Sequence, residues 1–188
     1  MSSVGEPGTK EPLTLAELEA SSGVRTGRKH ILSILVENKP GVLTRIAGLF
    51  ARRGFNINTL AVGPTDDESL SRITLTLDGA MHPIDQVTKQ LHKLVNVIKI
   101  RDLEPSETVA RELALFKISA DGASRGEVMQ VVEIFRGKII NVTRRSVIVE
   151  VTGTWEKIEA FERMVRPFGL VEMARTGEIA ISRGRGET

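Results

Sequence analysis

The chain has 188 residues, 40% of them hydrophobic and 27% charged, which is the composition of a soluble globular protein of one or two small domains. Its formal charge of +2 leaves no large basic surface for a nucleic acid, and the absence of cysteine excludes disulfides, thiolate catalysis and cysteine metal sites. No apolar run approaches the roughly 20 residues of a membrane span, and the N-terminus lacks the basic start and apolar core of a secretory signal. We therefore expect a cytoplasmic protein that contacts neither nucleic acid nor membrane.

Residues 1–28 are polar and interrupted by glycine and proline. Such a segment buries too little apolar surface to order itself, so we expect a flexible N-terminal extension outside the fold. Within it, residues 13–19 could form a short helix, with Thr14 as a possible cap.

The first ordered segment reads as a buried strand, residues 30–36, followed by an amphipathic helix that ends at Gly54. Gly54 follows two arginines and suits a left-handed helix cap. One face of this helix is apolar and consists of Val42, Ile46, Leu49 and Phe50.

The loop between this strand and this helix contains Pro40 and Gly41. Proline fits near the first turn of a helix because its missing N–H costs nothing there. Gly41 has no side chain, so the N–H groups at the helix start are open to an outside acceptor such as a carboxylate. The alternative is a tight turn that needs glycine only for its backbone angles.

Four further elements complete a first unit, which we assign to residues 29–104. They are a strand at 56–62, an alternating strand at 72–77, a helix from Pro83 and a strand at 95–100. The alternation in the strand at 72–77 predicts one wet face. The order strand, helix, strand, strand, helix, strand is that of a split βαββαβ, ferredoxin-like module.

The same order repeats after residues 103–111, which read as a linker. Strands are predicted at 113–119, 139–143, 146–152 and 170–174, and helices at 125–135 and 155–165. The second half has residues 120–124 in place of the Pro-Gly opening, so we expect weaker or different ligand binding there. The predicted fold class is therefore α+β, with a second ferredoxin-like module over residues 105–188.

The loop and helix at residues 38–58 resemble the opening of an ACT domain, the small module that binds free amino acids. Other stretches resemble the small regulatory subunit of acetolactate synthase, and the similarity covers about residues 29–184. These stretches are 64–67 (Pro-Thr-Asp-Asp), 70–74, 89–94, 133–137 and 174–177.

The resemblance implies a regulatory chain that is not catalytic on its own and carries no cofactor. Its partner would be the large catalytic subunit, which holds thiamine diphosphate, magnesium and FAD and condenses 2-oxo acids. The chain would activate that subunit and confer feedback inhibition by valine or another branched-chain amino acid. ACT modules pair side by side, so the resemblance also implies a homodimer with effector sites at the junction. The alternative is an ACT-type amino-acid sensor that regulates a different partner.

The resemblance places the effector site on the Pro-Gly loop and the following strand. Two asparagines could each offer a carbonyl oxygen to an ammonium group and an NH₂ to a carboxylate, and two aliphatic side chains could wall an apolar pocket. Alternatively, the asparagines could only stabilise local turns and caps, and the aliphatic residues could only pack in the core. The residues that the resemblance implies are Asn38, Gly41, Leu43, Asn56 and Ile57, and the backbone N–H groups of Gly41 and Val42 could receive the carboxylate.

Other functions find little support in the sequence. The three histidines, His30, His82 and His92, are scattered, and the acidic run at 66–68 lacks a full set of metal ligands, so we predict neither a catalytic nor a metal site. An RNA-binding sheet needs exposed aromatic residues on its central strands. The predicted strands at 56–62 and 72–77 contain none.

Overall fold

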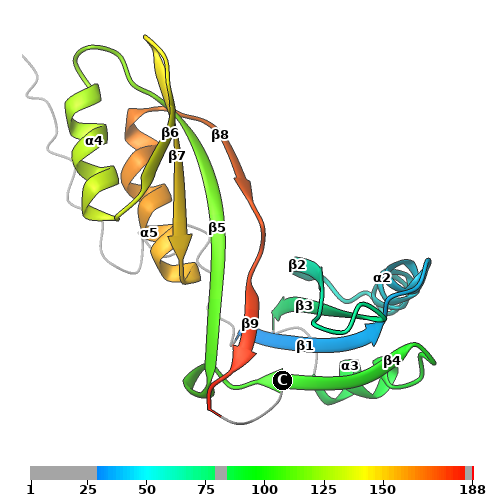
Figure 1. The fold of residues 1–188 in the computed structure, drawn as a ribbon. Coiled ribbons are helices and arrows are strands. Elements are labelled where there is room, and N and C mark those ends of the chain that lie inside the picture. Colours follow the sequence, from blue (N-terminus) through cyan, green and yellow to red (C-terminus); the bar gives the residue numbers. More distant parts are fainter. Residues whose placement is uncertain (1–28, 79–83, 185–187) are drawn as a thin grey trace, which may run out of the picture.

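The computed structural model describes residues 29–78, 84–184 and 188, and it has two lobes joined by one long strand and a short strand paired with it (Figure 1). The expected extension at residues 1–28, the expected helix start at Pro83 and His82 all lie outside the described residues. No helix among the described residues is long and apolar enough to cross a membrane.

The N-terminal lobe is a four-stranded antiparallel sheet with two helices on one face (Figure 1). The strand order is β2-β3-β1-β4. The elements are β1 (Lys29–Glu37), α2 (Val42–Arg53), β2 (Ile57–Pro64), β3 (Leu70–Asp78), α3 (Ile84–Leu91) and β4 (Val97–Leu103). The predicted βαββαβ order is confirmed.

The helix α2 forms where its apolar periodicity predicts. Its four buried residues are the predicted face, Val42, Ile46, Leu49 and Phe50. The helix ends at Gly54, whose φ of 68° is left-handed, and the N–H of Phe55 then donates to the carbonyl of Phe50 at 3.0 Å. Glycine adopts this conformation without the clash that a Cβ would cause, so the chain can turn directly into β2.

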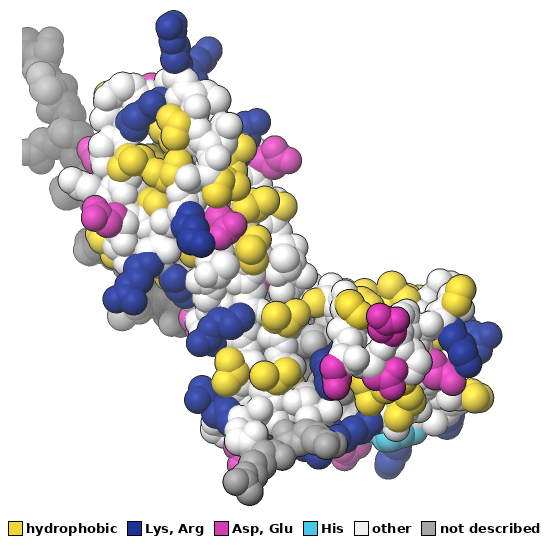
Figure 2. Space-filling model, viewed as in Figure 1, with side chains coloured by type: hydrophobic (Ala, Val, Ile, Leu, Met, Phe, Trp, Pro, Cys, Tyr) yellow, Lys and Arg dark blue, Asp and Glu magenta, His cyan; other side chains and the backbone are white. Residues whose placement is uncertain are grey.

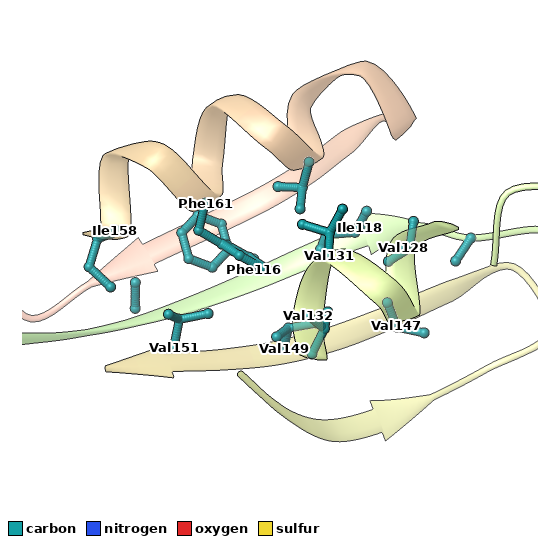
Figure 3. Close-up of a cluster of buried hydrophobic side chains, with 13 residues drawn as sticks. Phe116, Ile118, Val128, Val131, Val132, Val147, Val149, Val151, Ile158 and Phe161 are labelled. Atoms are coloured by element: carbon teal, nitrogen blue, oxygen red, sulfur yellow. The ribbon is translucent and has the colours of Figure 1, made fainter. Parts of the chain in front are cut away.

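The C-terminal lobe repeats the arrangement with the strand order β6-β7-β5-β8. Its elements are the 3₁₀ turn η1 (Pro105–Glu107), β5 (Thr108–Ser119), α4 (Arg125–Ile134), β6 (Lys138–Val142), β7 (Ser146–Gly153), α5 (Trp155–Val165), η2 (Arg166–Phe168), β8 (Leu170–Arg175) and β9 (Ile179–Ser182). Phe161 of α5 packs edge-on against Phe116, with ring centroids 4.8 Å apart (Figure 3), and against Phe135, with ring centroids 5.4 Å apart. Two ferredoxin-like sheets in an α+β fold are therefore confirmed.

The stretch read as a linker, residues 103–111, is ordered instead. It holds the end of β4, η1 and the first four residues of β5, and Thr108–Arg111 pair antiparallel with β9. The strand β9 was not predicted. Ala180 of β9 packs with Ile31 and Leu103 of the N-terminal lobe in a small core, so burial between the lobes orders both segments.

Two details of the N-terminal lobe also differ from the expectation. Val95 lies in the turn before β4 and is 92% exposed, because β4 begins only at Val97. The face of β3 expected to be wet is covered: Thr74 and Thr76 are buried. The chain before β9 crosses this face, where a Cβ on Gly177 would lie 3.0 Å from the Cβ of Thr59.

A buried ion-pair network holds β5, β8 and α5 together in the C-terminal lobe. Arg175 donates two hydrogen bonds to the buried carboxylate of Glu112, at 2.8 and 2.7 Å, and a third to Glu159 at 2.6 Å. The bonds to Glu112, reinforced by Glu159, raise the pKa of Arg175 above its ordinary value. Because the carboxylate and guanidinium satisfy each other, the charges can be buried.

Candidate functional site

Gly41 lies at the N-terminal end of α2, in the loop that the sequence singled out. Its φ of 83° is left-handed, and a Cβ built on it would meet no atom within 4 Å. Glycine is therefore needed for the backbone angle, and the space in front of the helix is also open. The structure thus has the backbone angle that the tight-turn explanation requires, and it leaves the space that an anion site would need.

In the described part of the chain, several backbone N–H groups at the start of α2 lack a good hydrogen-bond acceptor. The N–H of Val42 donates to the carbonyl of Lys39 at a long 3.4 Å. Within the described residues, the N–H groups of Gly41, Leu43 and Thr44 have no acceptor. Unpaired N–H groups and the positive end of the helix dipole together favour an anion at this position.

Asn38 fixes the loop to the turn between β2 and β3, which consists of residues 65–69. Its backbone N–H donates to the carbonyl of Ser69 at 2.7 Å, and its side-chain Nδ2 donates to the carbonyl of Glu68 at 3.0 Å. Asp67 belongs to the same turn and accepts from the hydroxyl and N–H of Ser69 at 2.6 and 2.9 Å. These bonds, the hydroxyl first, lower the pKa of Asp67. A turn of this kind positions Asn38 before any ligand arrives.

Glu37 fixes the other side of the loop. Its carboxylate accepts from Nδ2 of Asn96 at 2.5 Å and from Nζ of Lys39 at 3.1 Å. The bond from Asn96, the larger cause, and that from Lys39 lower the pKa of Glu37. Asn96 also accepts from Arg45 of α2 at 3.1 Å. Asn96 had no signal in the sequence, because 59 positions separate it from Glu37.

The other expected site residues differ in what they can offer. The side chain of Val42 is buried in the core of the N-terminal lobe, so only its backbone faces outward. Leu43 is exposed and can contact a ligand. Ile57 is half-buried against the same core, and Asn56 is exposed, with its Nδ2 3.4 Å from Oδ1 of Asn58.

Within one chain the structure does not bring these six residues together. Ile57 pairs with Leu77 at one end of β3, whereas Pro64 pairs with Ser71 at the other. The loop with Asn38 lies at the Ser71 end, and Asn56 lies at the Leu77 end. The eight residues of β2 separate the two groups by about 23 Å.

Among the described residues there is no group of three or more histidine, aspartate or glutamate side chains that could hold a metal ion. His30 instead lies against Asp102, with Nδ1 3.0 Å from Oδ2. The geometry of the loop suits recognition of a small carboxylate by backbone and amide groups.

Two family profiles match the chain. Residues 32–99 match the profile described as the AHAS small subunit-like ACT domain, and residues 111–184 match that of the small subunit of acetolactate synthase. The acetolactate synthase small subunit of Mycolicibacterium smegmatis is 49% identical over 155 residues, which cover 82% of this chain and 91% of that protein. The probable small subunit of Methanothermobacter thermautotrophicus is 52% identical over 156 residues, covering 82% and 93%.

A solved structure is also similar. The crystal structure of the acetolactate synthase small subunit from Thermotoga maritima has a TM-score of 0.77 to this chain at 44% sequence identity. The match covers 85% of this chain and 99% of that one.

Proposed function

This chain belongs to the small, regulatory subunits of acetolactate synthase, an enzyme of branched-chain amino-acid biosynthesis, and from that premise we propose how it acts. It binds the large catalytic subunit, raises its activity, and makes it sensitive to valine or another branched-chain amino acid. Thiamine diphosphate, magnesium and FAD belong to the catalytic subunit in this proposal. We also propose the division into an extension at 1–28, an ACT domain at 29–104 and a second domain at 105–188.

The observation that carries the effector proposal is the start of α2. It combines free N–H groups, an open space at Gly41 and a loop held in place by Asn38 and Glu37. The carboxylate of an amino acid would accept from the helix N–H groups, and the amide oxygen of Asn38 would accept from its ammonium group. Leu43 would contact the aliphatic side chain. Preorganisation lowers the entropic cost of binding.

A second copy of the chain would complete this site. The strand β2 is an edge of its sheet, and natural sheets cover or pair such edges. If two β2 strands pair antiparallel about a twofold axis through their centres, Ile57 of one copy lies opposite Pro64 of the other. Pro64 is at the loop end of the sheet, so Asn56 of the second copy would reach the loop that holds Asn38. The separation of the six residues within one chain therefore supports a homodimer with sites at the junction.

Sedimentation and calorimetry on the chain alone test this arrangement. We expect a dimer at micromolar concentration, with one valine bound per chain. Asn56→Ala and Asn38→Ala should each weaken valine binding, although the two residues are far apart in one chain. A monomer that binds valine as tightly as the dimer would contradict the shared site.

A further inference from the structure

A groove lies in the corner between the two lobes. It has a volume of about 430 Å³. One wall is the face of the N-terminal sheet formed by residues 61–64 of β2 with Arg72 and Thr74 of β3. The other wall is the two-stranded ribbon formed by β9 and the start of β5, including Val109, Arg111 and residues 179–181. Figure 2 shows hydrophobic and basic side chains in the corner where the lobes meet.

The groove is apolar and its charged residues are both basic. Ile179 and Ile181 remain 63% and 57% exposed, although they are large aliphatic side chains on a strand. Arg72 is held in place by two 3.0 Å hydrogen bonds from its Nη1, one to Oγ of Ser33 and one to the main-chain oxygen of Thr188. Arg111 has no carboxylate partner among the described residues, and its Nη1 donates to the carbonyl of Ala110 at 2.7 Å. An apolar surface next to an exposed guanidinium without a carboxylate partner, that of Arg111, suits an occupant that has an apolar side chain beside an acidic one.

The groove is also connected to the effector loop. Pro64 and Arg72 flank the β2–β3 turn, whose carbonyls at Glu68 and Ser69 accept the two hydrogen bonds of Asn38. A movement of the effector loop can therefore be transmitted to this wall of the groove through the β2–β3 turn, without any rearrangement of the core of the N-terminal lobe. The opposite wall belongs to strands that continue into the C-terminal lobe, so an occupant touches both lobes at once.

We propose that this groove is a docking site for the catalytic subunit, which inserts an apolar side chain flanked by a carboxylate. The inference rests on the proposed function, because it assigns the surface through which activation occurs. A second copy of the chain is a poorer fit, since twofold pairing through the edge of β2 uses its free backbone groups and leaves this face uncovered. A small ligand in the groove would leave much of Ile179 and Ile181 in water, whereas a protein segment would cover both.

Two substitutions in the groove and one matched control test the proposal. Ile179→Asp puts a carboxylate on the apolar wall, and Arg111→Glu reverses an exposed charge. Ile134→Asp is the control, because Ile134 is 76% exposed at the end of α4 and is not among the residues that line the groove. Each variant is mixed with the purified catalytic subunit carrying its cofactors, and the dissociation constant, the activation factor and the valine inhibition are measured.

We expect Ile179→Asp and Arg111→Glu each to weaken binding by about tenfold or more, with a parallel loss of activation, as is typical of central interface residues. Ile134→Asp should bind within about twofold of wild type, as substitutions outside an interface do. Arg111→Glu should also reduce the dependence of the association rate on salt.

Wild-type affinity and activation in both groove variants would overturn the proposal. So would a change in the mass of the chain alone, which would assign the groove to contact between copies. Loss of valine inhibition with unchanged affinity for the catalytic subunit would assign it to a small ligand and also overturn it. If wild type itself neither binds nor activates the catalytic subunit, the proposed function fails first and this inference fails with it.

Discussion

Replacing Gly41 by aspartate places a negative charge where the effector carboxylate is expected. The residue has an open space of at least 4 Å around its Cβ position, so the side chain fits without displacing the protein. Its φ of 83° adds a backbone cost of about 1–2 kcal/mol for a residue with a Cβ, with asparagine and aspartate among the best tolerated. Asparagine has nearly the same shape and no charge, so Gly41→Asn is the matched control.

The difference between the two variants isolates the charge. Two carboxylates about 4 Å apart repel by about 1 kcal/mol in water and about 4 kcal/mol near a protein surface of lower effective dielectric. Because Gly41 is exposed, the lower part of this range applies, about 1–2 kcal/mol. That corresponds to about 5- to 30-fold weaker valine binding for Gly41→Asp than for Gly41→Asn.

Valine inhibition curves of complexes with the catalytic subunit measure this difference. The Gly41→Asp curve should shift to higher valine by the same factor relative to Gly41→Asn, while activation without valine is kept. Thermal melting of each variant shows whether the fold is intact. Superimposable curves for the aspartate and asparagine variants would refute the anion site at the start of α2.

Three other predictions concern the C-terminal lobe. Arg175→Met should lower the free energy of unfolding by about 3–5 kcal/mol, because the carboxylate of Glu112 stays buried without a partner. In urea titrations, adding Glu112→Gln to this variant should recover part of the lost stability. No recovery would contradict the ion-pair explanation. Phe161→Ala should lower the free energy of unfolding by about 3–5 kcal/mol in the same assay, because its ring is fully buried between two other phenylalanine rings. A decrease of less than about 1 kcal/mol would contradict this, because it would mean that neighbouring side chains move to fill the cavity. The pKa of Asp121 is lowered from 3.8, mainly by the hydrogen bond that the N–H of Ser124 donates to its carboxylate. The ionised carboxylate therefore stabilises the fold above pH 3.8, and this stabilisation disappears as the pH falls toward the lowered pKa of the folded state. Asp121→Asn should therefore lose less stability than wild type across that range, and identical acid titrations would contradict this role.

Strong local periodicity made most of the fold predictable. The helix α5 was expected at 155–165 and spans Trp155–Val165, with Thr154 capping it through a hydrogen bond from the N–H of Lys157. The strand β9 is only four residues long, and it forms because it pairs with Thr108–Arg111 some 70 positions earlier. That partner segment looked like a linker because nothing local shows that it is half of a ribbon.

Residues that depend on distant partners could not be predicted. Glu112 is an acidic residue that can be buried because Arg175, 63 positions away, donates hydrogen bonds to its carboxylate. For the effector site, the sequence and its resemblance named Asn38 and Asn56, but only the register of β2 on β3 reveals that they lie at opposite ends of the sheet. The groove between the lobes was missed because it requires the unpredicted strand β9.

The regulatory role is tested most directly by the rate of acetolactate formation by the purified catalytic subunit with its cofactors. The rate is measured for the catalytic subunit alone, after addition of this chain, and after addition of this chain with valine. We predict that the chain raises the rate and that valine then lowers it, with much less effect of valine on the catalytic subunit alone. A rate that the chain leaves unchanged, or an activated rate on which no branched-chain amino acid has any effect, would contradict the proposed function.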